Sequence, residues 1–286
     1  MSASPSSAAE KRSRFHALHR SGCFVIPNPW DLGSARYLEA LGFQALATTS
    51  SGFAWTRGCP DGGVPREAVL EHLRAMAEAT DLPVNADFQG GFAHEPQGVA
   101  QSVRLAVETG VAGLSIEDST GDIAKPLYDL DDAIARMRAA RKAIDQSGGD
   151  TLLVGRAECF LAGRPDIDET ISRLQAYASA GADCLYAPGI RTPEHIRRVV
   201  ESVAPKPVNL LVGYASPLSV KEIAALGVRR ISVGGALARV AWGGFMRAAK
   251  LLAEQGRFDG FADTASHDTL ESLMRVPAGD LPIRGL

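Results

Sequence analysis

The chain has 286 residues, of which 45% are hydrophobic and 22% are charged, and its formal net charge is −3. This composition is typical of a globular protein with enough apolar material for a large core. The balanced charge argues against nucleic acid or an anionic membrane as a partner. No apolar stretch approaches the roughly 20 residues that a membrane-spanning helix needs, so we expect no membrane association.

The first residues and the cysteines bear on location. Residues 1–12 (MSASPSSAAEKR) lack the apolar segment of a signal peptide, so we expect a loose arm within an N-terminal region over 1–20. The four cysteines show no metal-binding spacing and lie mostly in apolar runs. We therefore expect buried, reduced thiols and a cytoplasmic protein. Cys59 alone lies in a polar Gly/Pro-rich segment, where it could be accessible.

Short apolar runs alternate along the chain with segments of helical period. The predicted strands are Cys23–Pro27, Ala45–Thr49, Pro83–Asp87, Gly113–Glu117, Leu152–Arg156, Cys184–Ala187, Pro207–Leu211 and Arg230–Gly234. The predicted helices are Glu67–Ala79, Val99–Glu108, Leu130–Ile144, Ile167–Ser179, Pro193–Ser202, Leu218–Leu226, Phe245–Glu254 and Asp268–Met274. Four helical segments end in a glycine just before the next strand, which predicts a left-handed C-terminal residue at Gly42, Gly110, Gly181 and Gly227.

Eight strands with helices between them predict a parallel sheet covered on both faces. We therefore predict an α/β fold, a (β/α)8 TIM barrel over residues 21–250, followed by a C-terminal helical extension over 251–286. The alternative is an open doubly wound sheet, but the G-x-G-x-x-G motif is missing after the first strand. Barrel enzymes carry their catalytic groups at the carboxyl ends of the strands.

Three predicted strands end in polar residues two positions apart, and such residues share one face of a strand. These pairs are Asn85/Asp87, Ser115/Glu117 and Arg156/Glu158. Buried charges are costly unless they are neutralised, and acidic groups beside an arginine suit a cation together with an anionic ligand. The pattern predicts an active site.

The acidic residues Asp87 and Glu117 are hard oxygen donors without a nearby histidine or cysteine, which points to Mg2+ or Mn2+. The alternative is structural, with Asp118 capping a helix and Glu117 paired to Arg156. Arg156 suits a substrate carboxylate or phosphoryl group because its planar fork donates two parallel hydrogen bonds. Its alternative role is a structural pair with Glu158.

Two long connections and two short polar turns are further candidates. Residues 50–66 and 119–129 are lids or plain surface loops. Ser50-Ser51-Gly52 offers hydroxyl and N–H donors to an anion, or is a simple turn. Gly234-Gly235 could bind phosphate or form a tight strand-to-helix turn.

In chain order, the motifs resemble the isocitrate lyase/phosphoenolpyruvate mutase superfamily over about residues 20–250. The matching segments are TTSSG (48–52), Asp61, NADFQGG (85–91), SIEDSTG (115–121), GRAECFLAG (155–163), YASAGADCLYAPG (177–189) and PVNLL (207–211). The order and spacing of the acidic motifs make the match specific.

The resemblance implies a barrel whose last helix is swapped between subunits, commonly in a homotetramer that is a dimer of dimers. It also implies Mg2+ near Asp87 and Glu117, with Asp61 and Asn85 nearby. Substrates of this superfamily share an α-oxo or α-hydroxy carboxylate, which Arg156 would hold, and bond cleavage yields an enolate-like species. The other residues implied to bind that carboxylate are Ser51, Gly52 and Asn209.

The chain departs from its relatives at several positions. Residues 119–127 contain neither Cys nor His, so the catalytic cysteine loop of isocitrate and methylisocitrate lyases is absent. Lys125 is the only lysine there, and no asparagine accompanies it as in phosphoenolpyruvate mutase. Asn85 replaces an aspartate, and Thr49-Ser50 replaces an aromatic-containing pair. Pro188-Gly189 stands where relatives place Glu or His.

These observations lead to a Mg2+-dependent lyase that cleaves a C–C bond in a small 2-oxo or 2-hydroxy di- or tricarboxylate. The expected catalytic residues are Arg156, Glu158 and Lys125, while Tyr186 and a metal-bound water remain alternatives for the acid/base. The competing hypotheses are a C–P enzyme that resembles phosphonopyruvate hydrolase, and an oxo-acid-binding protein without turnover.

Overall fold

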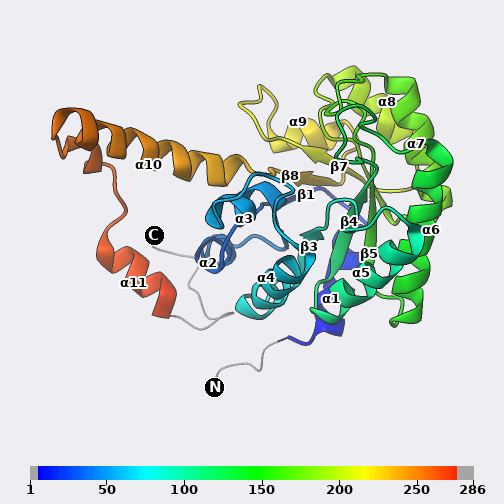
Figure 1. Cartoon of the computed structure of the whole chain (residues 1–286), viewed down its shortest axis with the longest axis horizontal. Helices are drawn as coiled ribbons and strands as arrows, with labels where there is room; N and C mark the ends of the chain where they lie inside the picture. The colour runs from blue at the N-terminus through cyan, green and yellow to red at the C-terminus, as the bar shows by residue number, and fades with distance from the viewer. Residues whose placement is uncertain (1–5, 276–286) are drawn as a thin grey trace.

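The computed structural model describes residues 6–275. Its eight parallel strands form one sheet in the order β1-β8-β7-β6-β5-β4-β3-β2, a nearly closed barrel (Figure 1). The strands are β1 (Phe24–Ile26), β2 (Leu46–Ala47), β3 (Val84–Asp87), β4 (Gly113–Glu117), β5 (Leu152–Arg156), β6 (Cys184–Tyr186), β7 (Val208–Leu211) and β8 (Arg230–Ser232). The barrel prediction is confirmed, and the open doubly wound alternative is excluded.

The barrel closes between its first two strands without a regular ladder. The Ala47 N–H donates to the carbonyl of Pro27 at 3.0 Å. Beside it, Asn28 donates to the carbonyl of Thr48 at 2.9 Å and accepts from the N–H groups of Val233 and Gly234 at 2.9 and 2.8 Å. One buried amide side chain therefore ties the ends of β1, β2 and β8 together at the carboxyl end of the barrel.

Helices on the outside cover the sheet. They are α2 (Leu32–Ala40), α3 (Ser50–Thr56), α4 (Arg66–Ala79), α5 (Pro96–Glu108), α6 (Leu130–Gln146), α7 (Ile167–Ser179), α8 (Pro193–Val203) and α9 (Val220–Ala225). All four predicted glycine endings have positive φ angles, from 82° at Gly42 to 105° at Gly181. Each lets its helix stop and the chain turn into the next strand.

From residue 6 onward the N-terminal segment is not the loose arm that composition suggested, and residues 1–5 of that predicted arm lie outside the described part of the chain. Residues 8–18 form helix α1 (Ala8–Leu18), capped by Ser7. Lys11 donates to the carbonyls of Ala77 and Thr80, both at 2.7 Å, at the end of α4. Arg12 donates to the carbonyl of Val107 in the last turn of α5 and to that of Val111, which lies between α5 and β4. The helix docks by capping its neighbours' carboxyl ends, where cations are favoured.

Two apolar layers result from this arrangement. The larger lies between the strands and the outer helices. The smaller fills the amino end of the barrel, where Phe15 of α1 packs with Phe24, Ile26 and Leu152. A Cβ on Gly113 would lie 2.7 Å from the Phe15 ring, so only glycine leaves room for this plug. The opposite, carboxyl end is polar.

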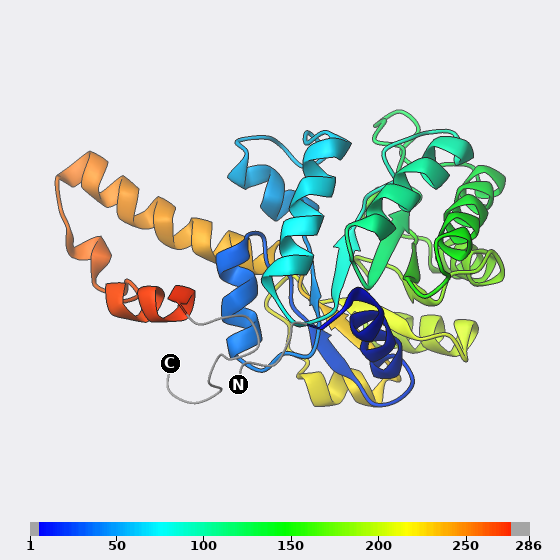
Figure 2. The same cartoon turned by 90° about the horizontal axis from the view of Figure 1, so that it is seen from below.

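The C-terminal helices differ from the rest. Helix α10 (Ala236–Gln255) follows β8 and projects away from the barrel, and α11 (His267–Arg275) returns toward α2 (Figures 1 and 2). Between them lies a short 3-10 turn, η1 (Asp259–Phe261). Only Ala238 of α10 is buried. Within residues 6–275, no helix is long and apolar enough to cross a membrane.

Candidate active site

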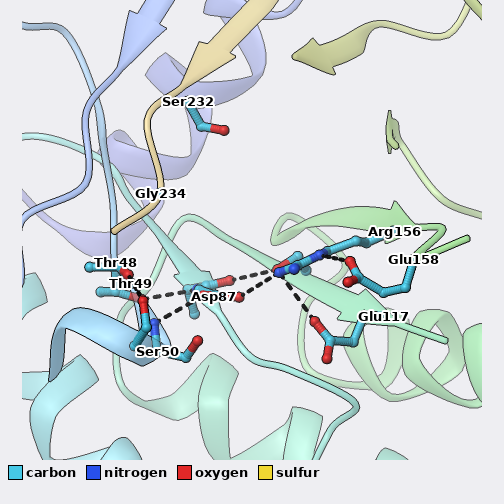
Figure 3. Close-up of polar contacts among 12 residues, drawn as sticks. Thr48, Thr49, Ser50, Asp87, Glu117, Arg156, Glu158, Ser232 and Gly234 are labelled. Atoms are coloured by element: carbon cyan, nitrogen blue, oxygen red, sulfur yellow. Dashed lines mark hydrogen bonds and ion pairs between the residues drawn. The ribbon is translucent and has the colours of Figure 1, made fainter. Parts of the chain in front are cut away.

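The guanidinium of Arg156 lies among three carboxylates at the carboxyl end of the barrel (Figure 3). Its Nη1 lies 3.2 Å from Asp87 Oδ1 and 3.1 Å from Glu117 Oε2, and its Nε donates to Glu158. The side chains come from β3, β4 and β5, three neighbouring strands, because each is the last residue of its strand or follows it closely. At least one member of each polar pair predicted from the sequence therefore converges here, namely Asp87, Glu117, Arg156 and Glu158.

Asp87 is fixed from the side of β2. Its second oxygen accepts from the backbone N–H of Ser50 at 2.9 Å, and its own N–H donates to the Thr48 hydroxyl at 2.9 Å. Ser50 is the first residue of helix α3, so the segment 50–56 is helix and not part of a loop as its composition suggested. The N-terminus of a helix favours a negative charge, and here it orients the Asp87 carboxylate.

The charges at this cluster do not balance. Three carboxylates face one guanidinium, which leaves two formal negative charges. Burial raises the pKa of Glu117 to about 8, an effect that Arg156 opposes and that Glu158 and Asp87 increase. Burial also raises the pKa of Glu158. Hard oxygen donors with this charge deficit fit a divalent cation such as Mg2+, which needs few protein ligands because it retains water.

The site also contains the two ion pairs that the sequence offered as purely structural alternatives to metal and substrate binding. Glu117 and Glu158 both pair with Arg156. In the described part of the chain, no group of three or more His, Cys, Asp and Glu side chains is placed to share one metal ion. The fit of a cation therefore rests on Asp87 and Glu117 and on their unbalanced charge.

Asp118, the neighbour of Glu117, points away from the site. It is buried and accepts from the Glu158 N–H at 2.8 Å, from Arg173 at 3.1 Å and from the Tyr177 hydroxyl at 2.6 Å. It does not cap a helix, since α6 begins after Asp129. Its bond to the Glu158 backbone sets the position of the residue that faces Arg156.

Two adjoining cavities open at this end of the barrel. The outer one has a volume of about 540 Å3 and is lined by Asp61, Glu117, Arg156 and Glu158 among others. The inner one, of about 180 Å3, runs into the barrel. Its lining includes the predicted residues Ser51, Asp61, Asn85, Asp87, Arg156 and Asn209. Most of the residues singled out from the sequence thus border one continuous polar space.

Two predicted residues do not reach this space. Gly52 is buried in α3, and its N–H donates to the capping hydroxyl of Thr49 at 3.3 Å. A Cβ there would lie 2.6 Å from Thr49 and 2.8 Å from Trp30, so glycine is required for packing. Lys125 is 57% exposed and pairs with Asp129 at 2.6 Å, because its loop turns outward over the bridge from Ser119 to Leu127.

Asn85 and Asn209 line the inner cavity but are engaged below the carboxylates. The amide oxygens of both accept from Arg230, at 3.3 Å and 2.8 Å. The Asn209 amide nitrogen donates to Ser232 at 2.9 Å. Asn85 therefore does not join the carboxylate cluster, and Asn209 has both ends of its amide occupied.

The loop after β3 is held by an arginine that no sequence motif singles out. Arg136 of α6 is 2% exposed and donates to the carbonyls of Gly90, Ala93 and His94. Its guanidinium also lies 4.0 Å from the centre of the Tyr128 ring. It thereby joins the loop after β3 to the end of the segment after β4, both of which border the outer cavity.

The fold and the position of this site are those of the (β/α)8 barrel enzymes, whose active sites lie at the carboxyl ends of the strands. A family model described as phosphoenolpyruvate phosphomutase matches residues 15–253, most of the chain. The protein belongs to this family, within the phosphoenolpyruvate mutase/isocitrate lyase superfamily.

Similar proteins include enzymes of several activities. A crystal structure from Burkholderia cenocepacia J2315, classed provisionally as a lyase or mutase, matches with TM-score 0.92 and 44% identity, over 96% of this chain and 99% of that one. Oxaloacetate decarboxylase of Chromohalobacter salexigens is 30% identical over 79% of each chain. A structure of 2,3-dimethylmalate lyase matches with TM-score 0.82 and 26% identity, over 94% and 95% of the two chains.

Proposed function

We propose that the protein is a Mg2+-dependent lyase that cleaves a C–C bond in a small 2-oxo or 2-hydroxy di- or tricarboxylate. The observation that carries the proposal is the group of Asp87, Glu117 and Glu158 around Arg156. Two similar enzymes support it, because their names, oxaloacetate decarboxylase and 2,3-dimethylmalate lyase, are those of enzymes for acids of this class.

In this proposal Asp87 and Glu117 would hold Mg2+, or Mn2+ in its place, and Asp61 lines both cavities. The bound ion supplies Lewis-acid stabilisation of the oxygen on which negative charge develops. Arg156 donates to the substrate carboxylate, since its planar fork suits that group. The Ser51 hydroxyl, which lines the inner cavity, is the second donor to it.

Glu158 is the proposed acid/base. When the C2–C3 bond of a 2-hydroxy dicarboxylate breaks, the C2 hydroxyl gives its proton to water and becomes the oxo group of the departing oxo acid, and the bonding electron pair forms an enolate on the fragment that keeps the distal carboxylate. A proton must then be added to C3 of this enolate to give the second product. Glu158 faces the outer cavity beside Arg156, and its raised pKa favours the protonated form that can supply this proton. Lys125 would take this role only if its loop turned inward.

The test is a panel of oxaloacetate, 2-methylisocitrate, 2,3-dimethylmalate and phosphonopyruvate, each assayed with Mg2+ and with EDTA. We expect Mg2+-dependent release of an oxo acid from one or more of the C–C substrates. The Glu158→Gln variant should lose kcat more than it changes KM. Full activity in EDTA would contradict the proposal.

The second candidate is a C–P enzyme, and the description of the matching family model favours it. Its signature is release of phosphate from phosphonopyruvate with no oxo acid formed from the C–C substrates. Binding of 2-oxo acids without any turnover would instead identify a binding protein.

We also propose that a second copy of the chain covers α10 by exchange of this helix, within a dimer of dimers. Large apolar side chains on α10 are exposed, among them Val240 at 72% and both Phe245 and Met246 at 62%. Isolated chains rarely expose so many neighbouring apolar groups. The projection of α10 away from its own barrel supports exchange (Figure 1).

A further inference from the structure

Arg230 lies inside the barrel, where a positive charge is unusual. It is the first residue of β8 and is only 2% exposed. Its Nε donates to Asn209 Oδ1 at 2.8 Å, and its Nη1 lies 3.3 Å from Asn85 Oδ1. Both partners are neutral amides. The guanidinium is therefore oriented by hydrogen bonds, but these bonds do not neutralise it.

No carboxylate within residues 6–275 forms an ion pair with Arg230. The other titratable groups that face it are the side chains of Cys184 and Tyr186, whose pKa values burial raises, and His19, whose pKa is lowered to about 3 mainly by burial. All three are neutral near pH 7. Burial lowers the pKa of Arg230 as well, yet a guanidinium remains charged in proteins.

A buried charge without a counter-charge is costly, so the site favours an anion. Arg230 borders the inner cavity, whose lining also includes Asp87 and Arg156. Asn85 and Asp87 face the same side of β3, one two-residue step apart, which is roughly 7 Å. The Arg230 guanidinium, bonded to Asn85, therefore lies about this far below the carboxylate cluster. The cavity of about 180 Å3 is smaller than most ligand pockets.

We propose that Arg230, oriented by Asn209 and Asn85, binds the distal carboxylate of a short dicarboxylate that enters the barrel with its reacting end at Arg156. This inference rests on the proposed function for the identity of the reacting end. It places the distal carboxylate of the substrate in the interior of the barrel. Specificity for dicarboxylates over monocarboxylates then comes from Arg230, with Asn209 and Asn85 as positioning residues.

The test compares malate with lactate, two 2-hydroxy acids of which only malate has a distal carboxylate. Affinity is measured by calorimetry on the full chain with Mg2+ present. A charge-assisted, bidentate bond predicts that the wild-type protein prefers malate about tenfold or more, or about 1.4 kcal/mol. Arg230→Gln places an amide N–H where the Arg230 Nε lies, so it can still donate to Asn209, but it removes the charge. It should abolish the preference and leave lactate affinity unchanged.

The neighbouring Arg229 provides the matched control. It lies on the other face of the strand and donates to the carbonyl of Gly22, so Arg229→Gln should keep the malate preference. Arg230→Lys retains the positive charge and should keep part of the preference, which covers the case that Arg230→Gln does not fold. Retention of the full preference in Arg230→Gln, or equal loss of malate and lactate affinity, would overturn the inference.

The outcomes separate this inference from the proposed function. An Arg230-dependent malate preference without turnover of any panel substrate would leave the anion site in place and refute the lyase. Turnover by a wild-type protein that binds malate and lactate equally would support the lyase and refute the role of Arg230.

Discussion

Replacing Arg156 by methionine removes the guanidinium that contacts Asp87, Glu117 and Glu158. The side chain of Arg156 is 15% exposed, and the three carboxylates are 19%, 16% and 8% exposed. Removing one partner of a buried ion pair costs about 3–5 kcal/mol, because the remaining charge is left uncompensated. Partial exposure and proton uptake reduce this cost, so we expect a loss near the lower end, about 3 kcal/mol.

The assay is urea unfolding followed by far-UV circular dichroism at pH 8 without metal. A loss of about 3 kcal/mol is measurable, since domains are typically stable by 5–15 kcal/mol. Arg164→Met is the matched control, because Arg164 is 53% exposed and pairs with Glu169 at 2.9 Å. That exposed pair contributes at most about 1 kcal/mol.

The same unfolding experiment is repeated with Mg2+ to test whether the ion binds at the carboxylates. If the ion binds among the carboxylates, it should stabilise Arg156→Met more than it stabilises the wild-type protein, because it replaces the missing positive charge. At a concentration of 100 times Kd, binding adds about 2.7 kcal/mol. The reasoning is wrong if Arg156→Met loses no more stability than Arg164→Met, or if Mg2+ stabilises neither protein.

Further substitutions test the separate parts of the account. In metal-free buffer, Glu117→Gln should become more stable relative to wild type as pH rises from 4.5 to 8, by at most about 1.4 kcal/mol per pH unit. The reason is that the wild-type protein loses the stability linked to its raised Glu117 carboxyl pKa as pH rises through that pKa. A difference in unfolding free energy that does not change with pH would contradict this. Asp118→Ala should lower the free energy of unfolding in urea by about 3–5 kcal/mol, because Asp118 forms a buried ion pair with Arg173. The Mg2+ affinity of the folded protein should stay unchanged. A reduced Mg2+ affinity would instead show that Asp118 contributes to the metal site. Light scattering should show that Phe245→Asp dissociates the oligomer and that Lys250→Ala, an exposed change on the same helix, does not.

The sequence predicted the strands well because their residues are buried on both faces. Gly113–Glu117 and Leu152–Arg156 were predicted with the bounds that the structure shows. Short parallel strands read as continuous apolar runs, and glycine endings separate them from the helices. The period of two then places Asp87 and Glu117 on the inner face at one end of the barrel, so much of the carboxylate cluster was predictable.

Helices α1 and α3 could not be predicted in the same way, because their contacts are not apolar stripes. Helix α1 is held by the long polar side chains of Lys11 and Arg12, which resemble those of a solvated segment. Helix α3 is short, and its Gly/Ser-rich start is typical of a turn. Only the neighbouring elements show what these polar groups bind.

Arg230 was missed for a related reason. In the run Val228-Arg229-Arg230-Ile231, two arginines at the start of a predicted strand resemble a charged strand end. Alternation along the strand sends one outward and the other inward, and which of them faces inward depends on the register with β7. The pairing of Asn209 with Arg230 across β7 and β8 is therefore a property of the closed barrel.

The proposed chemistry depends on a divalent cation held by Asp87 and Glu117 next to an oxo acid held by Arg156. The most direct measurement is a crystal structure with Mn2+ and pyruvate, in which the anomalous signal locates the ion. We expect the ion between the two carboxylates, with the pyruvate carboxylate on the Arg156 guanidinium. A structure in which pyruvate is bound but Asp87 and Glu117 contact only Arg156, with no anomalous signal beside them, would contradict the account.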